Sequence, residues 1–511
     1  MEQQFDDYRT DFAYVSYYTS KISPLYMRMA LLLRGVDMPV PEEGQPMRYL
    51  ELGFGRGLSL AIHAAVTEGE YWGVDFLQQH CEELQSLTDE SGIDCHVLNC
   101  DFAAADAMSE KGELPQFDMI ALHGIYSWVN AENRQHIQNI IRRNLREGGV
   151  VYISYNSEPG WSFFEPVRDL MLSILKRYGD DIDMETRIRE TLQYVIAMAE
   201  TPSAFFATTP RAVSYLKSLA KEDVKYLAQE YFNTTWQSFY FRQVAEDMEK
   251  SGCTFVNSAD FFSQTGAYTH PQVTELISRS VNPLIRETLR DFAVNNKFRM
   301  DYFVKSPRRL NGKEASEKLA DMTVRLSINR EDVNYEIKVN YNSLTLMPEL
   351  FEPMLDILAT PPVSAKRVGD FTGDMLTTSE GRRVMTECVA TMLAAGYMVP
   401  FNDNPSEREH EMTRRLNRAL CSRALEESKG SFLAASKLAA GYHVQTSDQL
   451  FMLYQEGRNS DPEALARKVV DHLYKKGLNQ SYQDSVNLHT LAAKSFLNTR
   501  LPIYDAIGVE I

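Results

Sequence analysis

The chain has 511 residues, of which 44% are hydrophobic and 24% are charged, and its formal net charge is −17. Such acidity argues against general affinity for a nucleic-acid backbone, which needs clustered lysine and arginine. It suits a basic partner, and it also serves solubility alone. No apolar run approaches the length of a membrane-spanning helix, and the acidic N-terminal stretch lacks the features of a signal peptide. We therefore expect a cytoplasmic protein that neither inserts into a membrane nor binds nucleic acid.

The six cysteines are scattered along the chain, with no CxxC pair and no His/Cys cluster at metal-ligand spacing. Disulfide frameworks and zinc sites both need such paired spacings. The sequence therefore predicts reduced thiols and no metal site.

The first third of the chain alternates short apolar runs with amphipathic stretches. Strand-like runs lie at 47–53, 71–76, 94–102, 117–124 and 150–155, and helix-like runs lie at 58–69, 78–92 and 132–149. This alternation indicates βαβ units, and hence a parallel sheet with helices on both faces. The carboxyl ends of the strands then share one edge, where ligands bind in such sheets.

Beyond residue 165 the pattern changes. Residues 165–200 and 210–250 are predicted to be helical, and a short strand is predicted at 253–261. Runs at 298–306, 322–329 and 333–341 alternate apolar and polar residues, as half-buried antiparallel strands do. From about Leu350 onward the chain is again mostly helical. We expect an α/β domain over 1–165, a mainly helical middle domain over 166–290 and an α+β C-terminal domain over 291–511.

The glycine-rich stretch YLELGFGRGLSLA, which starts at Tyr49, follows the first predicted strand. Its spacing is GxGxG, and Leu58 stands where the third glycine of a dinucleotide fingerprint would be. No Gly-Lys-Ser/Thr follows, so a phosphate-binding P-loop is excluded. The spacing ExGxGxG, from Glu51 to Gly57, instead resembles motif I of class I S-adenosylmethionine-dependent methyltransferases.

Two acids then recur at the ends of the next strands. Asp75 ends YWGVD and Asp101 lies in NCDF, and LREGGVVYISY resembles the segment that follows motif IV in the same enzymes. The resemblance implies S-adenosylmethionine as cofactor, with Asp75 on the ribose hydroxyls and Asp101 on the adenine. An acid such as Asp75 also occurs in dinucleotide enzymes. The implied cofactor-binding residues are Glu51, Gly53, Phe54, Gly55, Gly57, Asp75, Phe76, Asp101, Phe102 and His123.

The methyl-acceptor side is expected in ALHGIYSWVN and SYNSEPGW, which follow the fourth and fifth predicted strands. Aromatic rings there would face the sulfonium charge, and a histidine could accept a proton directly or through water. The alternative is that the aromatic residues only pack and the histidine is a hydrogen-bonded loop residue. The candidates for a catalytic role are His123, Tyr126, Trp128, Tyr155 and Asn156.

These two segments, together with KYLAQEYFNTTW and GCTFVNSADF, resemble bacterial methyltransferases that carry a methyltransferase regulatory domain. The rickettsial outer-membrane-protein lysine methyltransferases belong to this group. The resemblance implies a Rossmann-like class I methyltransferase sheet and a protein substrate held between the domains. The region AYVSYYTSKISPLY departs from the family pattern, and there Tyr17 and Tyr18 serve either as a lid or as a staple for the first helix.

The sequence thus predicts an S-adenosylmethionine-dependent methyltransferase that acts on lysine side chains of a protein, and its acidic charge suits a basic one. Two alternatives stay open. One is methylation of a sugar, glycan or other small metabolite, and the other is a binding protein that has kept the fold without turnover.

Overall fold

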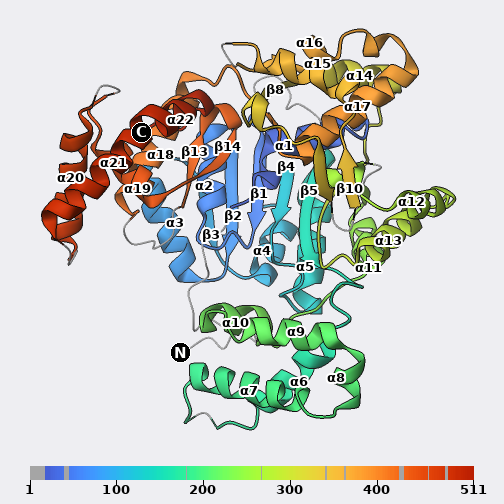
Figure 1. The fold of residues 1–511 in the computed structure, drawn as a ribbon. Helices are drawn as coiled ribbons and strands as arrows, with labels where there is room; N and C mark the ends of the chain where they lie inside the picture. Colours follow the sequence, from blue (N-terminus) through green and yellow to red (C-terminus); the bar gives the residue numbers. More distant parts are fainter. Residues whose placement is uncertain are drawn as a thin grey trace.

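The structure, a computed structural model, describes residues 18–38, 45–179, 181–265, 268–339, 342–361, 364–424, 431–457, 460–477 and 481–511. Its centre is a seven-stranded sheet with the strand order β3-β2-β1-β4-β5-β7-β6 (Figure 1). The strands are β1 (Arg48–Leu52), β2 (Glu70–Asp75), β3 (His96–Asn99), β4 (Phe117–Leu122), β5 (Leu145–Asn156), β6 (Cys253–Ser258) and β7 (Phe298–Lys305).

Strands β1 to β5 are mutually parallel, whereas β7 runs antiparallel to both β5 and β6. Every residue of β4 is buried, which explains its uninterrupted apolar sequence, FDMIAL. The carboxyl ends of β1 to β5 therefore meet at one edge of the sheet. This arrangement confirms the predicted α/β class and its parallel sheet.

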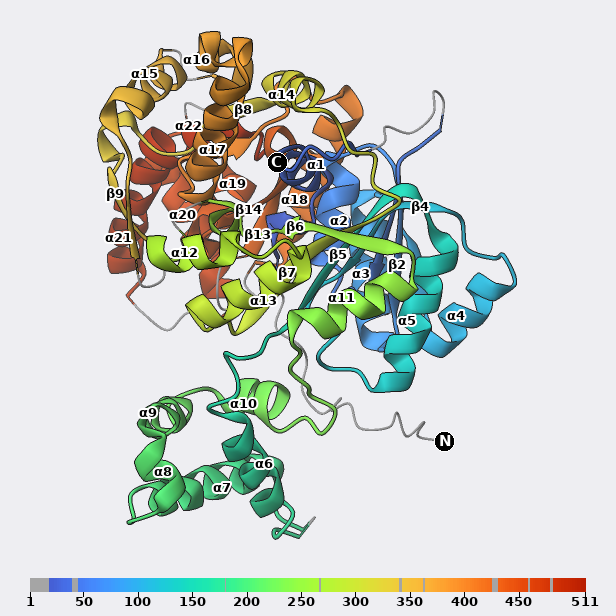
Figure 2. The same ribbon diagram turned by 90° about the vertical axis from the view of Figure 1, so that its right-hand side faces the viewer.

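Helices cover both faces of the sheet (Figure 2). One face packs against α1 (Pro24–Leu32), α2 (Leu58–Val66) and α3 (Gln78–Ser91). The other packs against α4 (Phe102–Glu110), α5 (Ala131–Asn144) and α11 (Phe241–Lys250). Helix α4 was not predicted, and it begins where Asp101 accepts a hydrogen bond from the N–H of Ala104 at 2.8 Å.

Between β5 and α11 the chain forms a helical lobe with its own core, which stands apart from the sheet in Figures 1 and 2. The lobe consists of α6 (Glu165–Leu175), α7 (Met184–Ala199), α8 (Ala204–Thr208), α9 (Pro210–Leu219) and α10 (Val224–Tyr231). Its aromatic residues are mostly core: Tyr231, Phe232 and Trp236 are buried, whereas Tyr240 beyond the lobe is exposed.

The predicted domain boundaries at 165 and 290 differ from this architecture. Strands β6 and β7 lie in the central sheet, although the sequence places them 97 and 142 residues after Asn156, the last residue of β5. Because both strands complete the sheet that begins at β1, the α/β unit extends to Lys305 and the helical lobe is an insertion within it. The half-buried antiparallel strand predicted at 298–306 is this buried seventh strand.

The remaining elements surround the face that α1 and α2 cover. Between β6 and β7 lie η2 (Phe261–Gln264), α12 (Pro271–Ser278) and α13 (Pro283–Val294), and η1 (Ser20–Ile22) precedes α1. A second unit has a three-stranded antiparallel sheet, β11-β8-β12, and the hairpin β9-β10. Its elements are α14 (Gly312–Ala320), β8 (Thr323–Leu326), η3 (Arg330–Asp332), β9 (Glu336–Val339), β10 (Asn342–Thr345), α15 (Pro348–Ala359), β11 (Lys366–Arg367), α16 (Val368–Thr372), η4 (Gly373–Thr377), α17 (Ser379–Ala394) and β12 (Met398–Pro400).

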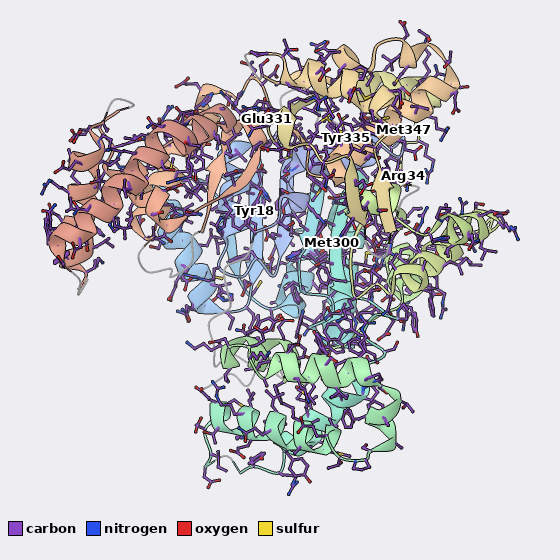
Figure 3. The ribbon with its side chains drawn as sticks, viewed as in Figure 1. Tyr18, Arg34, Met300, Glu331, Tyr335 and Met347 are labelled. Atoms are coloured by element: carbon purple, nitrogen blue, oxygen red, sulfur yellow. The ribbon has the colours of Figure 1, made fainter. Side chains whose placement is uncertain are left out.

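The C-terminal elements pack on α2 and α3 through α18 and on α2 through the hairpin β13-β14. They are α18 (Glu407–Ser422), β13 (Ser431–Ala435), η5 (Ser436–Leu438), β14 (Ala440–Val444), α19 (Thr446–Tyr454), α20 (Pro462–Lys475), α21 (Tyr482–Ser495), the π-helical turn η6 (Phe496–Arg500) and α22 (Leu501–Ile507). Tyr18 lies beside this hairpin and the sheet (Figure 3) and is buried, whereas Tyr17 lies outside the described residues. The Tyr18 hydroxyl contacts His63 of α2 and Gly441 of β14, so Tyr18 joins the hairpin to α2 and does not staple the first helix.

Candidate active site

A cavity of about 380 Å³ opens at the carboxyl ends of β1, β2, β3 and β4. Eight of the residues that the sequence singled out line it: Gly53, Gly55, Asp75, Phe76, Asp101, Phe102, His123 and Trp128. The cavity therefore lies at the edge where an open parallel sheet binds its ligands.

The glycine loop approaches the cavity without side chains. Gly53, Gly55 and Gly57 have φ values of +72°, +60° and +76°, a backbone region that other residues rarely adopt. A Cβ on Gly53 would lie 2.3 Å from Ile125 Cδ1, whereas one on Gly55 would meet no atom within 4 Å. Gly55 therefore faces open space, as a backbone cradle for a ligand would. Gly57 is the N-cap of α2 and does not line the cavity: a Cβ there would lie 2.8 Å from Leu84 Cβ, so this glycine lets α2 pack closely on α3.

Asp75 fixes this loop as well as lining the cavity. Its Oδ2 accepts a hydrogen bond from Gly55 N–H at 2.9 Å, and its Oδ1 accepts one from Leu77 N–H at 3.0 Å. His80 Nδ1 lies 3.2 Å from the same Oδ1. Oδ1 thus has two neighbours, whereas Oδ2 has one and retains a lone pair with which Asp75 can accept a hydrogen bond from a ribose hydroxyl.

Asp101 and Phe102 lie at the next strand end. Asp101 uses Oδ1 to cap α4, and the structure gives its Oδ2 no hydrogen-bond partner among the described residues. Phe102 is half-buried and lines the cavity beside it. An acceptor oxygen beside an aromatic face is the pairing that an adenine amino group and ring need.

Glu51 and Phe54 lie behind the loop, and neither lines the cavity. Glu51 is 3% exposed, and burial raises the pKa of its carboxyl to about 8. Hydrogen bonds from Ser59 and Tyr49 lower that pKa by less than burial raises it. Phe54 packs into the core, where its ring lies against Gly73. For Phe54 the predicted contact with the cofactor is corrected: its side chain supports β2 instead.

His123 is held by two hydroxyl groups. Its Nδ1 lies 2.8 Å from Tyr152 Oη and 3.3 Å from Ser154 Oγ. Burial, and then the positive charge of Lys21, lower the pKa of His123 to about 4. The imidazole is therefore neutral at physiological pH. Trp128 also lines the cavity, and its ring packs against the core of the helical lobe.

Three predicted acceptor-side residues do not line the cavity. Tyr126 is fully buried, and its hydroxyl donates to Asp247 Oδ2 at 2.8 Å. Tyr155 is also buried and donates to Asp301 Oδ2 at 2.7 Å. Both side chains lie in the core between the sheet and α11. They are packing residues, and their predicted catalytic role is corrected.

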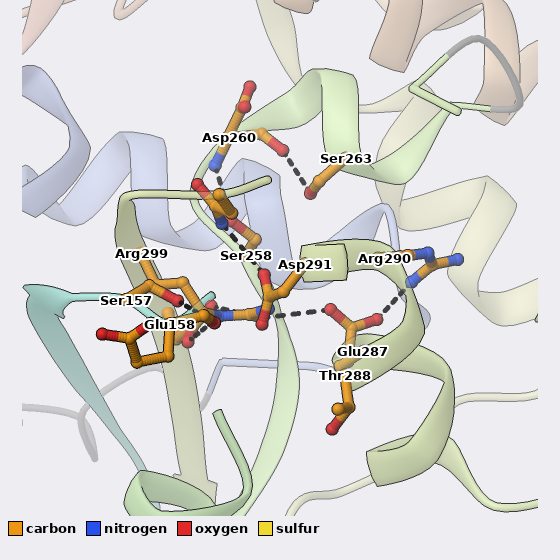
Figure 4. Close-up of polar contacts among 12 residues, drawn as sticks. Ser157, Glu158, Ser258, Asp260, Ser263, Glu287, Thr288, Arg290, Asp291 and Arg299 are labelled. Carbon is orange, nitrogen blue, oxygen red and sulfur yellow. Dashed lines mark hydrogen bonds and ion pairs between the residues drawn. The ribbon is translucent and has the colours of Figure 1, made fainter. Parts of the chain in front are cut away.

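Asp301 belongs to a buried ion cluster around Arg299, with Arg299–Asp291 and Arg299–Glu287 distances of 2.9 and 3.1 Å (Figure 4). Asn156 is 8% exposed. Its main-chain N–H donates to Ser127 Oγ, and its carbonyl accepts from Phe239 N–H. This residue fixes the loop of Trp128 and does not reach the cavity itself.

Other lining residues were missed from the sequence. These are His80 on α3, Asn130, Asn133 and His136 at the N-cap and in the first turns of α5, and Thr235 in the segment between α10 and α11. His136 Nδ1 lies 2.8 Å from Asp106 Oδ2, which directs its Nε2 away from that acid. Thr235 donates to Trp128 O at 3.0 Å. Thr235 lies 178 residues after Gly57 in the sequence, so no local signal points to it.

Among the described residues, no group of three or more His, Cys, Asp or Glu side chains could hold a metal ion. All six cysteines are described and none forms a disulfide. In the part of the chain that the structure describes, no helix is both long and apolar enough to span a bilayer.

Comparison with known proteins agrees with this geometry. Residues 50–149 match the family described as "Methyltransferase domain", and residues 223–305 match the "Predicted methyltransferase regulatory domain". The chain is 28% identical over 518 residues to the uncharacterized protein sll1526 of Synechocystis sp., with 99% of both chains covered. It is 25% identical over 329 residues to the uncharacterized protein RP789 of Rickettsia prowazekii, covering 64% of this chain and 58% of that one.

The solved structure of PKMT2 from Rickettsia typhi in complex with AdoHcy has the same fold, with a TM-score of 0.69. It is 17% identical, and the match covers 97% of this chain and 99% of the other. The fold and the cavity together define a class I methyltransferase, an enzyme that uses S-adenosylmethionine as its cofactor. The chain is a methyltransferase of the kind that carries a methyltransferase regulatory domain, and β6 and β7 of that domain complete its sheet.

Proposed function

We propose that this enzyme transfers methyl groups from S-adenosylmethionine to lysine side chains of a protein. One observation carries the proposal: Thr235 of the regulatory domain lines the cofactor cavity, and Phe298 of the same domain contacts the ring of His123, which also lines it. The family resemblance of the sequence and the likeness to PKMT2 support the choice of acceptor. The six free cysteines favour a cytoplasmic location for the reaction.

The residues present fit the cofactor. Gly53 and Gly55 would lie beneath its methionyl part, Asp75 would hold the ribose, and Asp101 with Phe102 would hold the adenine. When bound, the cofactor supplies a methyl group on a positively charged sulfur. The chain's own task is then to align a neutral amine with that methyl group and to exclude water.

The regulatory domain contributes to the acceptor side. Phe298, at the start of β7, contacts the His123 ring with a centroid distance of 6.3 Å. Tyr302, four residues further along β7, packs on Tyr152 with a ring-centroid distance of 5.8 Å. The Tyr152 hydroxyl in turn lies within hydrogen-bonding distance of His123. His123 thus lies between the methyltransferase domain and the regulatory domain. Of these rings Phe298 is exposed, and an exposed aromatic ring tolerates an alkylammonium group by cation–π contact.

A labelling experiment tests the acceptor class. The purified enzyme is combined with methyl-labelled S-adenosylmethionine and a lysate of the host. One half of the product is then treated with protease and the other half is left untreated. We expect the label in protease-sensitive material, and on lysine after hydrolysis. Label confined to small or protease-resistant species would replace a protein acceptor with a metabolite or glycan. Cofactor binding without transfer to any lysate fraction would favour the binding-protein alternative. Asp75→Ala enzyme provides the background.

A further inference from the structure

A lysine where the helical lobe meets the regulatory domain lies among three aromatic rings. The Nζ atom of Lys297 is 4.2 Å from the ring centroid of Tyr215. Its distances to the ring centroids of Phe163 and Trp161 are 4.8 and 5.4 Å. Each distance is within the ~6 Å over which an aromatic ring attracts a cation. The three rings, here called the ring cage, therefore hold one ammonium.

The rings stand as walls and do not form a stack. The ring plane of Tyr215 meets that of Trp161 at 79° and that of Phe163 at 71°, with centroid distances of 6.2 and 5.6 Å. Trp161 is 9% exposed, whereas Phe163 and Tyr215 are half-buried. Helix α9, which carries Tyr215, lies on the side of the lobe nearer the sheet (Figure 1). The ring cage thus has a buried wall and two walls that solvent reaches.

The main chain fixes the ring cage beside the active site. Lys297 O accepts a hydrogen bond from Trp161 Nε1 at 2.9 Å and another from Ser157 N–H at 2.8 Å. The residue after Lys297 is Phe298, whose ring contacts that of His123, and His123 lines the cofactor cavity. A group bound in the ring cage would therefore lie on the acceptor side of the cofactor.

The ring cage gives its present occupant no polar partner. Among the described residues, none accepts a hydrogen bond from Lys297 Nζ, and no carboxylate lies within 4.0 Å of it. Burial, and then the charge of Arg211, lower the pKa of Lys297. A primary ammonium has three N–H donors, and the faces of the rings offer them no lone pair. A trimethylammonium keeps the charge and has no N–H donor, so it suits the ring cage better than the lysine does.

We propose that the ring cage is a binding site for a methylated lysine side chain, and that Lys297 occupies it when no such ligand is bound. The choice of lysine rests on the proposed function, whereas the choice of a methylated ammonium rests on the cage itself. The Lys297 side chain would move out toward solvent, and the trimethylammonium of a modified substrate would take its place by cation–π contact. The enzyme would thereby retain its methylated product beside the active site.

Ligand-observed NMR titration of the full-length protein without S-adenosylmethionine tests the site, so a failure of methyl transfer does not affect the result. The probes are Nα-acetyl-Nε-trimethyllysine amide, the unmethylated lysine compound and a neutral isostere with carbon in place of the ammonium nitrogen. Lys297→Ala should bind the trimethyl compound at least about fivefold more tightly than either of the others. The wild type should show the same order of affinities with weaker binding, because Lys297 competes.

Lys221→Ala, at an exposed lysine of the lobe, is the matched control and should bind as the wild type does. Equal affinities for the trimethyl compound and the neutral isostere, in the wild type or in Lys297→Ala, would overturn the inference. Choline tests a small free quaternary amine as the source of the same group. Tighter binding of choline than of the trimethyllysine compound would overturn the assignment to lysine.

Two further variants isolate one ring of the cage. Lys297→Ala/Tyr215→Phe keeps the ring and should keep the preference for the trimethyl compound, whereas Lys297→Ala/Tyr215→Leu should lose that preference severalfold. Both variants lose the hydrogen bond between the Tyr215 and Tyr231 hydroxyls, which are 2.7 Å apart, so they differ only in the ring. An equal preference in the two variants would overturn the inference.

Discussion

The carboxylate of Asp75 accepts a hydrogen bond from the backbone N–H of Gly55, with an N–O distance of 2.9 Å. The acid that ends β2 therefore holds the middle glycine of the loop that follows β1. Asp75 also accepts from Leu77 N–H at 3.0 Å, so one side chain fixes both loops at this end of the cavity. Replacing Asp75 would therefore change the shape of the cofactor site and also remove the proposed contact with the ribose.

Asp75→Ala should weaken the binding of S-adenosylmethionine by more than about tenfold. The variant loses a charge-assisted contact worth ~1.5–3 kcal/mol and frees the Gly55 amide. Isothermal titration calorimetry measures the change. Asp89→Ala, at an exposed acid of α3, is the matched control and should bind as the wild type does. Affinity equal to the wild type in Asp75→Ala would contradict the ribose assignment.

The cofactor half of the site could be predicted because its residues lie at strand ends. Glycine spacing and an acid after each strand locate Gly55, Asp75 and Asp101, since the topology of a parallel sheet brings strand ends together. Side-chain direction in the following loops is different. Tyr126 lies in a loop after β4, and its sequence neighbours give no sign that it faces α11, more than one hundred residues away.

The same limit applies to the fold. Strands β6 and β7 are visible in the sequence as apolar runs. No local pattern indicates that they join the sheet of β1 to β5, because the five helices of the lobe lie between β5 and β6 in the chain. Pairing across such a distance depends on the packing of β5 against β7. Helix α4 was missed because it has only nine residues and its alanines form no clear apolar stripe. Asp101 is its only start signal.

Tyr126→Phe should lower the free energy of unfolding by ~0.5–1.5 kcal/mol, because it removes a part-buried hydrogen bond to Asp247, which keeps Lys250 as its other partner. Urea denaturation measures this loss. The affinity for S-adenosylmethionine should stay the same, since Tyr126 does not line the cavity. Trp128→Ala is the comparison, because Trp128 lines the cavity and its loss should reduce turnover. An unchanged stability with a large loss of turnover in Tyr126→Phe would return Tyr126 to the acceptor site.

The stability of the cofactor-free protein should depend on the titration of Glu51. Its pKa rises from the ordinary 4.5 to about 8 because the carboxyl is buried. The folded state thus keeps a proton that the unfolded chain has lost, and the stability that this provides is complete below 4.5 and is lost as the pH rises to about 8.

Glu51→Gln removes this titration and leaves the other ionisable groups in place. The wild type should therefore lose more stability than Glu51→Gln between about pH 5 and about pH 8, as measured by urea denaturation at each pH. Parallel pH profiles for the two proteins would show that Glu51 is already ionised in the folded state.

Gly441→Ala should destabilise the protein by ~1–3 kcal/mol, because the new methyl group overpacks a buried contact. A Cβ at Gly441 would lie 2.9 Å from Cε1 of Tyr18 and 3.0 Å from Cδ1 of Ile62, and both side chains are core. The Gly441 N–H also donates to Tyr18 Oη at 2.6 Å, which any shift of the hairpin would stretch. Gly312→Ala is the control: it begins α14, its Cβ would meet no atom within 4 Å, and the change should be neutral or stabilise by ~0.4–1 kcal/mol. Equal urea midpoints for the two variants would mean that Tyr18 does not hold β14 against α2.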